Sequence, residues 1–289
     1  MYLDKIKFGP SGTCEDFKNE GYLHTYQVPG WLKSKGLDCF EYSFGRGVML
    51  KPETATVIGK AFSDYDIEIS VHAPYFINLA TLESDKADNN VRYIFDSLKA
   101  LKLMGGKRCV FHPGSPLKNP RDQAMNVLLK AFERILQLKE EYGFGDMLLC
   151  PETMGKKAQL GNLDEIIAMC AMGDDTIVPC IDWGHLNSRD CGVFYTKDDY
   201  KRVIDKLVES IGEKKTKNMH VHFSKIQYSE GGEVRHLTFE DEVYGPPYEP
   251  FLEVAHDMGM TPYIVCESAG TQTRDALAMK SYFDGLLDN

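Results

Sequence analysis

The sequence predicts a (β/α)₈ TIM barrel that forms a single domain over residues 1–289. Two observations predict it: eight short apolar segments have the composition of buried strands, and amphipathic helical segments lie between them. Eight parallel strands that alternate with helices close into a barrel, and about 250 residues are enough for that fold. No Pro- or Ser-rich linker divides the sequence.

The eight predicted strands are rich in β-branched and aromatic residues and have the length of buried parallel strands. A doubly wound open sheet is the alternative, but it usually carries a Gly-rich phosphate loop after its first strand, and Gly9-Pro10-Ser11-Gly12 does not match G-x-G-x-x-G. The predicted strands are Lys5–Pro10, Asp38–Phe44, Ile67–Ala73, Arg108–His112, Met147–Glu152, Ile177–Asp182, Asn218–Phe223 and Pro262–Glu267.

Helical periodicity is clearest in the segment that follows the fourth predicted strand. Pro120 is predicted as the first helical residue, behind Asn119 as its cap. Apolar residues then keep i, i+3, i+4 spacing from Ala124 to Leu138, and Gly143 is predicted to end the helix. The same spacing recurs in two further segments, Val91–Leu101 and Tyr200–Ile211.

Composition predicts a globular, cytoplasmic protein. Hydrophobic residues make up 43% and charged residues 26% of the chain. No apolar run approaches the roughly 18 residues of a membrane span, and the first residues do not resemble a signal peptide, so no membrane partner is expected. The eight cysteines include no C-x-x-C pair, and those inside predicted strands are expected to be reduced, buried thiols.

The net charge of −10 by itself disfavours a nucleic-acid partner, because binding to phosphates normally needs a basic surface. The objection weakens if several carboxylates bind metal, since bound cations reverse the local charge. Net charge therefore does not decide the class of partner.

The C-terminal ends of the predicted strands carry imidazole and carboxylate groups. In an α/β barrel the active site is built at that end. Six consecutive strands, from the third to the eighth, deliver a His, Asp or Glu to this rim, which predicts a functional site there. The residues are His72, His112, Glu152, Asp182, His185, His220, His222 and Glu267.

A mixture of imidazole and carboxylate groups without a thiolate suits Zn²⁺, and Mn²⁺ is a second candidate. A tetrahedral zinc ion binds about four ligands, so this number of groups predicts more than one ion. A carboxylate such as Glu152 can bridge two ions through its two oxygens. Such a cluster binds the oxygens of a phosphodiester, generates hydroxide near neutral pH and stabilises the leaving oxygen.

Several of these motifs resemble those of endonuclease IV, in order, in spacing and in their place at strand ends. They are His72-Ala73-Pro74-Tyr75-Phe76-Ile77-Asn78-Leu79, Phe111-His112-Pro113-Gly114-Ser115, Cys180-Ile181-Asp182 with His185, and Met219-His220 with Lys225. The resemblance covers essentially the whole chain. It implies a zinc-dependent hydrolase that cleaves DNA 5′ to abasic sites in base excision repair.

The resemblance also implies a set of ligands for three zinc ions. Glu152 and Glu267 would be the catalytic carboxylates, and a hydroxide that bridges the metals would attack the phosphate. The implied ligands are His72, His112 and Glu152 for the first ion, the same Glu152 with Asp182, His220 and Glu267 for the second, and His185 and His236 for the third.

Endonuclease IV inserts side chains into the duplex, and the resemblance implies two such residues here. Tyr75 matches one of them well, and Arg46 is a looser match. A wedge of this kind fills the gap that an extruded abasic nucleotide leaves in the stack. The implied partner is duplex DNA with an abasic site, and the protein is expected to be a monomer. Trp183 either stacks on the substrate or packs beneath the seventh strand.

Two positions depart from the family pattern. Val234 stands where the family has the Asp of Asp-x-His, so two ions are expected and the third site stays open, with Glu233 or Asp241 as replacements after a loop shift. His222 stands where the family has Asn. Since His220 and His222 are two residues apart on a strand, both point to one face, and His222 is either an extra ligand or a donor behind the ligands.

Two other functions compete with the nuclease. A xylose-isomerase-like sugar isomerase or epimerase would use one or two divalent metals, and the acidic segment Tyr228–Pro250 together with Val234 favours it. A non-catalytic metal-binding scaffold is the third class. A scaffold would tolerate His112→Ala with the loss of metal alone, whereas an enzyme would also lose its activity.

Overall fold

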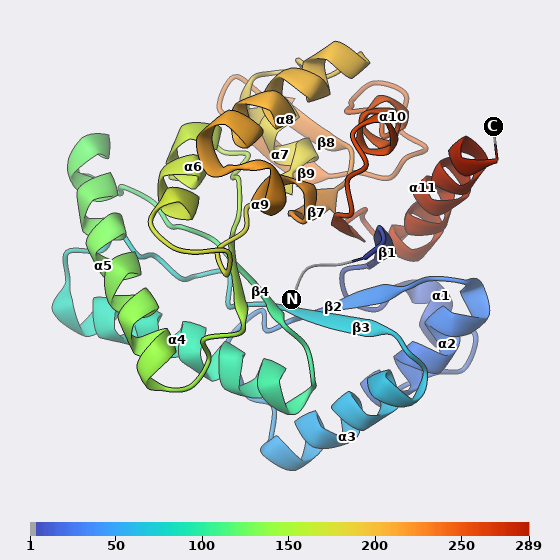
Figure 1. Ribbon diagram of the computed structural model, residues 1–289, viewed down its shortest axis with the longest axis horizontal. Helices are drawn as coiled ribbons and strands as arrows, with labels where there is room; N and C mark the ends of the chain where they lie inside the picture. Colours follow the sequence, from blue (N-terminus) through green and yellow to red (C-terminus); the bar gives the residue numbers. More distant parts are fainter. Residues whose placement is uncertain (1–3, 289) are drawn as a thin grey trace.

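The computed structural model describes residues 4–288 (Figure 1). Eight of its strands are parallel and form two four-stranded sheets, with the orders β1-β10-β7-β6 and β2-β3-β4-β5. Each lies within a segment predicted as a strand, so that prediction is confirmed. The bounds are β1 Lys7–Pro10, β2 Cys39–Ser43, β3 Glu68–His72, β4 Arg108–Phe111, β5 Leu148–Pro151, β6 Cys180–Asp182, β7 His220–Phe223 and β10 Tyr263–Cys266.

Parallel bridges at two seams join these sheets into a closed barrel. Ser11, just beyond β1, pairs with Glu41 of β2. At the other seam, Glu152, just beyond β5, pairs with Cys180 of β6. The predicted TIM barrel is therefore confirmed, and the C-terminal ends of its strands meet at one rim.

The helices lie around the strands, as Figure 1 shows, and an antiparallel hairpin of β8 and β9 follows β7. The hairpin is formed by β8 Ile226–Ser229 and β9 Gly232–His236. The helices are α1 Glu15–Asn19, α2 Val28–Lys35, α3 Pro52–Asp64, α4 Ser84–Leu103, α5 Arg121–Glu141, α6 Leu163–Ala171, α7 Trp183–Arg189, α8 Lys197–Ile211, α9 Glu213–Lys217, α10 Glu249–Asp257 and α11 Gln272–Leu287, with a 3₁₀ turn at Thr25–Gln27.

The start of α5 differs by one residue from the prediction. Pro120 has φ −54° and ψ 140°, so it is the residue before the helix, and Arg121 is the first helical residue. The ring of Pro120 fixes φ near the helical value, but the extended ψ lets the chain enter from the preceding loop. The helix ends as predicted, because Gly143 follows it with a φ of +71°.

Nearly every strand residue of the barrel is buried, and the cysteines inside strands are part of that core. All eight cysteines are free, as expected, and only Cys191 is exposed. The five in the predicted strands are 0% exposed and pack as small apolar side chains: Cys39, Cys109, Cys150, Cys180 and Cys266. In the described part of the chain, no helix is long and apolar enough to cross a membrane.

Trp183 is 0% exposed, which decides between its two predicted roles. Its ring lies 4.9 Å from that of Tyr200, 5.3 Å from Phe194 and 5.2 Å from Phe251, measured between centroids. These contacts place the side chain in the packing between the barrel and its outer helices. It is therefore not available to stack on a substrate.

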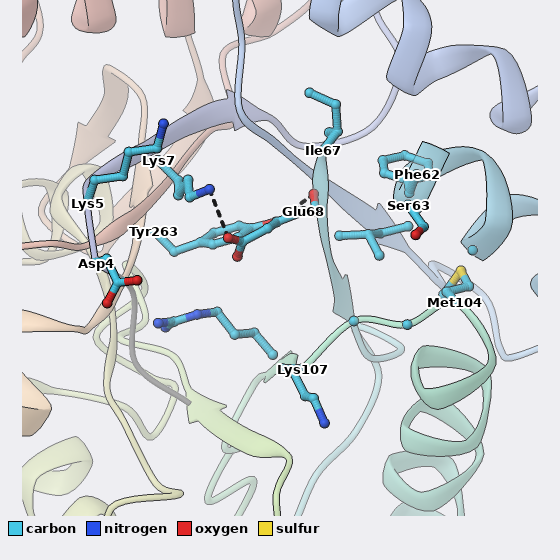
Figure 2. A pocket seen from close by; sticks show the side chains of 15 residues that line it. Asp4, Lys5, Lys7, Phe62, Ser63, Ile67, Glu68, Met104, Lys107 and Tyr263 are labelled. Carbon is cyan, nitrogen blue, oxygen red and sulfur yellow. Dashed lines mark hydrogen bonds and ion pairs between the residues drawn. The ribbon is translucent and has the colours of Figure 1, made fainter. Parts of the chain in front are cut away.

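A cavity of about 650 Å³ lies at the N-terminal ends of the strands (Figure 2). Lys7 and Glu68, at the starts of β1 and β3, line it and form an ion pair of 2.9 Å. Tyr263 at the start of β10 also lines it. None of the residues predicted for the functional site borders this cavity, so the candidate chemistry lies at the other end of the barrel.

Candidate metal centre

A smaller cavity of about 330 Å³ lies at the C-terminal rim of the barrel. It is lined by residues that follow or end strands on opposite sides of the barrel, which the closed sheet brings together. The structure thus brings together at one cavity most of the residues that were candidates from the sequence. The lining residues are Ser11, His72, Tyr75, His112, Glu152, His185, His236 and Glu267.

The first group of candidate ligands is His72, His112 and Glu152, as the resemblance implied. Glu152 Oε2 lies 3.0 Å from His72 Nε2 and 3.2 Å from His112 Nε2. The Nδ1 atom of His72 is 2.6 Å from the carbonyl oxygen of Ala73, to which it can donate. That bond leaves the lone pair of His72 Nε2 facing Glu152, which is the arrangement a metal ligand needs.

The second group contains Glu152, Asp182, Glu267 and His222. His222 Nδ1 lies 3.2 Å from Glu152 Oε1 and 3.6 Å from Glu267 Oε2. Asp182 Oδ1 accepts a hydrogen bond of 2.7 Å from the backbone N–H of His185, whereas Asp182 Oδ2 is buried without a hydrogen-bond partner. Glu152 belongs to the first and second groups and joins them.

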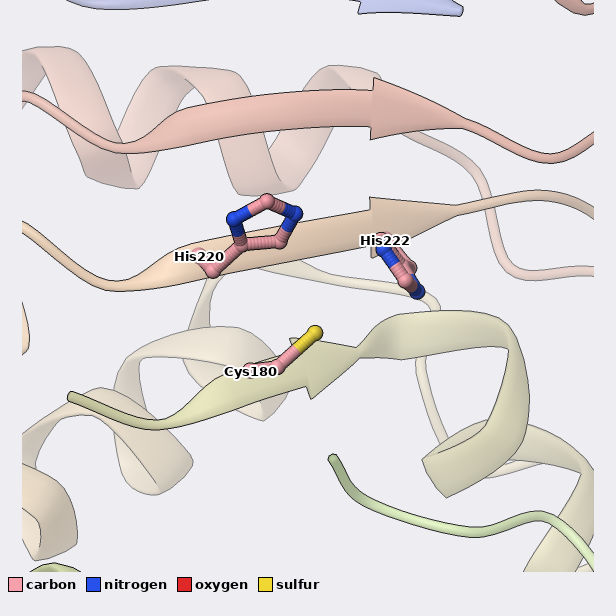
Figure 3. A group of neighbouring side chains, drawn as sticks. All are labelled: Cys180, His220 and His222. Carbon is pink, nitrogen blue, oxygen red and sulfur yellow. The ribbon is translucent and has the colours of Figure 1, made fainter. Parts of the chain in front are cut away.

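The structure does not bring His220 to this second group, so the predicted grouping of His220 with Asp182 and Glu267 is corrected to His222. His220 Nε2 instead lies 3.1 Å from Glu41 Oε2, and its ring stacks on Tyr263 with 5.0 Å between centroids. Both histidines are on one face of β7, but His222 is two residues, roughly 6–7 Å, further toward the C-terminal rim. Figure 3 shows His222 nearer the arrowhead of the strand.

The third group consists of His185, Glu233 and His236. His185 Nε2 lies 3.5 Å from Glu233 Oε2, and His236 Nε2 lies 3.9 Å from Glu233 Oε1. The Nδ1 atoms of both histidines face protein groups instead, at 2.8 Å from the Thr153 carbonyl oxygen and 2.8 Å from Ser224 Oγ. Glu233 therefore stands in the place that Val234 left open.

An irregularity in β9 explains how Glu233 reaches this position. Residues three apart on a regular strand point to opposite faces, so Glu233 and His236 would diverge. In the hairpin, Gln227 pairs with Arg235 and Tyr228 pairs with Glu233, so Val234 is the extra residue of a β-bulge. The bulge therefore turns the side chains of Glu233 and His236 to the same face of the hairpin, and it leaves Val234 51% exposed.

The carboxylates and imidazoles of these groups strongly perturb one another. Burial alone would raise the pKa of Glu152, but His222 and His112 hold it well below its usual range. Burial raises the pKa of Asp182, and Glu152 and Glu267 add to the rise against the opposing effect of His185. Burial would lower the pKa of His185, yet Asp182 and Glu152 raise it to about 10. Negative charge at the rim thus favours bound positive charge.

This donor set fits divalent metal ions. Imidazole nitrogens and carboxylate oxygens gather in three adjoining groups without a thiolate, and Asp182 Oδ2 is buried without an aligned hydrogen bond, although His185 Nδ1 lies 3.2 Å away. A buried carboxylate oxygen without a donor is costly unless a cation compensates it. Among the described residues the geometry thus offers these three groups, and a fourth, fully buried group of Cys180, His220 and His222, that could each hold an ion.

The two predicted DNA-contacting residues differ in their position. Tyr75 lies at the cavity, 47% exposed, with its ring 4.7 Å from that of His72 and 5.5 Å from that of His112. Burial of its hydroxyl raises the pKa of Tyr75 to about 12, so the phenol is protonated at neutral pH. Arg46 is exposed and borders a separate depression beyond β2, without a contact to the three groups.

Sequence reasoning missed Glu41, which is fully buried beneath the rim. Burial alone would raise its pKa, but His222 and His220 lower it below the usual range. Glu41 lies in the middle of an apolar strand segment, where a single carboxylate gave no motif. The one available signal was the alternation of inward- and outward-facing residues along the strand. It places Glu41 inside the barrel, where a charged residue needs a buried partner.

Glu233→Gln is expected to lower the bound zinc by about one ion per chain and to leave the first two groups loaded, because it removes the only carboxylate of the third group. The measurement is the zinc-to-protein ratio after dialysis. Val234→Ala is the control, since this exposed neighbour has no ligand atom. An unchanged ratio in Glu233→Gln would exclude the third group as an ion site.

Known proteins similar to this chain include an uncharacterized protein, proteins named as endonucleases and sugar epimerases. Residues 29–282 match a family described as xylose isomerase-like TIM barrel. An uncharacterized protein of Methanocaldococcus jannaschii is 34% identical over 95% of this chain and 96% of its own length. A protein of Mycoplasmoides gallisepticum named probable endonuclease 4 is 31% identical over 54% of this chain, which corresponds to 50% of that protein.

Solved structures with the same fold include an endonuclease and sugar epimerases. A D-tagatose 3-epimerase-like protein superposes with a TM-score of 0.72 at 19% identity and covers 98% of this chain and 97% of its own. Endonuclease IV of Thermus thermophilus superposes with a TM-score of 0.65 at 17% identity, over 98% and 99% of the two chains. At these identities the likeness shows the fold and leaves the reaction open.

Proposed function

The chain belongs to the xylose isomerase-like TIM barrel family, and from this premise we propose that it is a zinc-dependent phosphodiesterase that cleaves DNA 5′ to abasic sites. Family membership alone does not select this reaction, because both endonucleases and sugar epimerases share the fold. The choice rests on the residues at the rim.

The observation that carries the proposal is the continuity of the three ligand groups. Glu152 is common to the first and second groups, and its Oε1 lies 3.3 Å from His185 Nδ1 of the third. Three adjoining cationic positions suit the several negatively charged oxygens of a phosphodiester. Epimerisation of a neutral sugar gives the third group, with Glu233 and His236, no role.

The residues of this chain would hold and orient the reactants. When bound, divalent ions in such a centre supply a nucleophilic hydroxide near neutral pH and offset the charge of the phosphate. Glu152 joins the groups and fixes their spacing. Glu267, which is 15% exposed and lines the cavity, would accept a proton from the attacking water.

Two aromatic side chains beside the cavity suit insertion into the base stack of a DNA duplex. The ring of Tyr75 contacts that of His72 yet is half exposed, and Phe76 beside it is 50% exposed. An aromatic wedge here would occupy the space left by an extruded abasic nucleotide. Bound cations would offset the acidic net charge that otherwise opposes DNA binding.

A sugar epimerase is the second candidate, and one observation favours it. Glu152, Asp182, His222 and Glu267 form a complete four-ligand group for a single ion without the other two groups. The rim cavity of about 330 Å³ is also large enough for a small sugar. In that function Glu233 and His236 would be dispensable.

The deciding experiment compares both reactions in protein loaded with zinc or manganese. The substrates are a duplex oligonucleotide with one stable abasic analogue, the same duplex undamaged, and a panel of ketoses. We expect incision 5′ of the abasic position, abolished by chelator and by His112→Ala. Epimerisation without incision would replace the proposal by the second candidate, and metal-loaded protein that does neither would refute both.

A further inference from the structure

Glu41 is a fully buried carboxylate that the proposed reaction does not use. It projects from β2 into the barrel beneath the rim, where its Oε2 accepts a hydrogen bond of 3.2 Å from Ser70 Oγ. The same carboxylate lies 3.0 Å from His222 Nε2 and 3.1 Å from His220 Nε2. Burial of an ionised carboxylate costs desolvation free energy unless groups of opposite charge or hydrogen-bond donors pair with it.

His222 is the partner that connects Glu41 with the candidate metal centre. Its Nδ1 atom faces Glu152 and Glu267 at 3.2 and 3.6 Å, and its Nε2 atom faces Glu41 Oε1. Among the described residues, His222 Nε2 and Glu41 Oε1 have no hydrogen-bond partner, and their 3.0 Å separation is an ion-pair contact, whereas His222 Nδ1 is aligned with Glu152 Oε1 at 3.2 Å. The imidazole therefore stands between the metal groups at the rim and a single carboxylate below.

A neutral imidazole can bind a metal only through the nitrogen that carries no proton. A carboxylate beside the other nitrogen keeps the proton there, fixes the ring orientation and makes the ligand more basic. We propose that Glu41 is a positioning residue that holds the proton of His222 on Nε2 and so directs the Nδ1 lone pair at the second metal group. This inference rests on the proposed metal centre.

The neighbouring His220 supports the same arrangement from below. Its Nε2 atom lies beside the second oxygen of Glu41, and its ring is fixed by stacking on Tyr263. His220 therefore restrains the carboxylate, which accounts for a histidine at this depth that binds no ion at the rim. Cys180 lies beside both histidines, as Figure 3 shows, with candidate ligand atoms within 4.8 Å of one another.

The first test measures metal affinity in Glu41→Gln, which keeps the size of the side chain and removes its charge. Competition with a chromophoric chelator should show that zinc and cobalt bind the second group about 10–100-fold more weakly. The visible spectrum of bound cobalt should change as well. Asp275→Asn is the matched control, because this buried carboxylate accepts hydrogen bonds from Phe239 N–H and Thr271 Oγ1 and belongs to none of the ligand groups.

The second test needs no variant and so does not depend on the folding of Glu41→Gln. Nitrogen-15 spectra of the zinc-loaded wild-type protein, with the His222 signal assigned, should show a proton on Nε2 and a metal-bound Nδ1. A proton on Nδ1 would overturn the proposal, as would Glu41→Gln with wild-type affinity and an unchanged cobalt spectrum. Wild-type protein that binds no metal would instead refute the proposed function on which the inference rests.

One competing explanation makes its own prediction. If Cys180, His220 and His222 themselves held an ion, Cys180→Ala would lose one metal per chain, and the thiolate-to-cobalt absorption of the wild-type protein would disappear. That result would overturn the positioning role. We expect Cys180→Ala to keep the full metal content, because the thiol packs as a small apolar side chain.

Discussion

Glu152→Gln is expected to abolish metal-dependent incision of abasic DNA, with a loss in kcat/KM on the order of 10³-fold or more. Glu152 lies within 3.3 Å of His72, His112, His185 and His222, so its carboxylate is the one group that joins all the ligand sets. An amide of the same size cannot bridge two cations. The measurement is single-turnover incision together with metal content, which should fall as well.

The matched control is Glu68→Gln, the same chemical change at the opposite end of the barrel. Glu68 pairs with Lys7 and its side chain is 43% exposed, so its replacement should leave activity and metal content unchanged. If Glu152→Gln kept wild-type incision, the shared carboxylate would not be part of the reaction. If the wild-type protein did not incise DNA and Glu152→Gln only lost metal, the result would support a non-catalytic metal-binding scaffold instead.

Removal of the ions is expected to lower the unfolding temperature of the protein by about 10 °C. A ligand that binds only the folded state adds about 4 kcal/mol at a concentration 1,000 times its Kd, and about 2–4 °C accompany each kcal/mol in a protein of this size. Without the ions, Glu152, Asp182 and Glu267 are close together and repel one another. The measurement is the unfolding temperature with chelator and after addition of zinc.

The metal-free protein should also respond to pH in a defined direction. The pKa of His185 is raised from 6.5 to about 10 by Asp182 and Glu152 against the effect of burial, so its contribution is fully present below pH 6.5 and is lost as pH rises toward 10. Metal binding must displace such protons, and zinc affinity should increase with pH in the same range. An unfolding temperature that neither zinc nor chelator shifts would contradict the metal centre.

The strands and the rim were predictable because both depend on local sequence. The alternation of apolar strands with amphipathic helices specifies a barrel irrespective of distant contacts, and parallel strands bring their C-terminal residues to one rim. His72 ends β3, and His112 and Glu152 directly follow β4 and β5, so their meeting could be predicted.

Only the tertiary structure decided the depth and the parity of the remaining ligands. His220 and His222 share a strand face, and which one reaches the second group depends on how far β7 extends relative to β6 and β10. Glu233 replaces the absent Asp only because a bulge at Val234 turns it to the face of His236. Register, stagger and bulges arise from pairing between distant segments, and a periodic pattern in one segment carries no information about them.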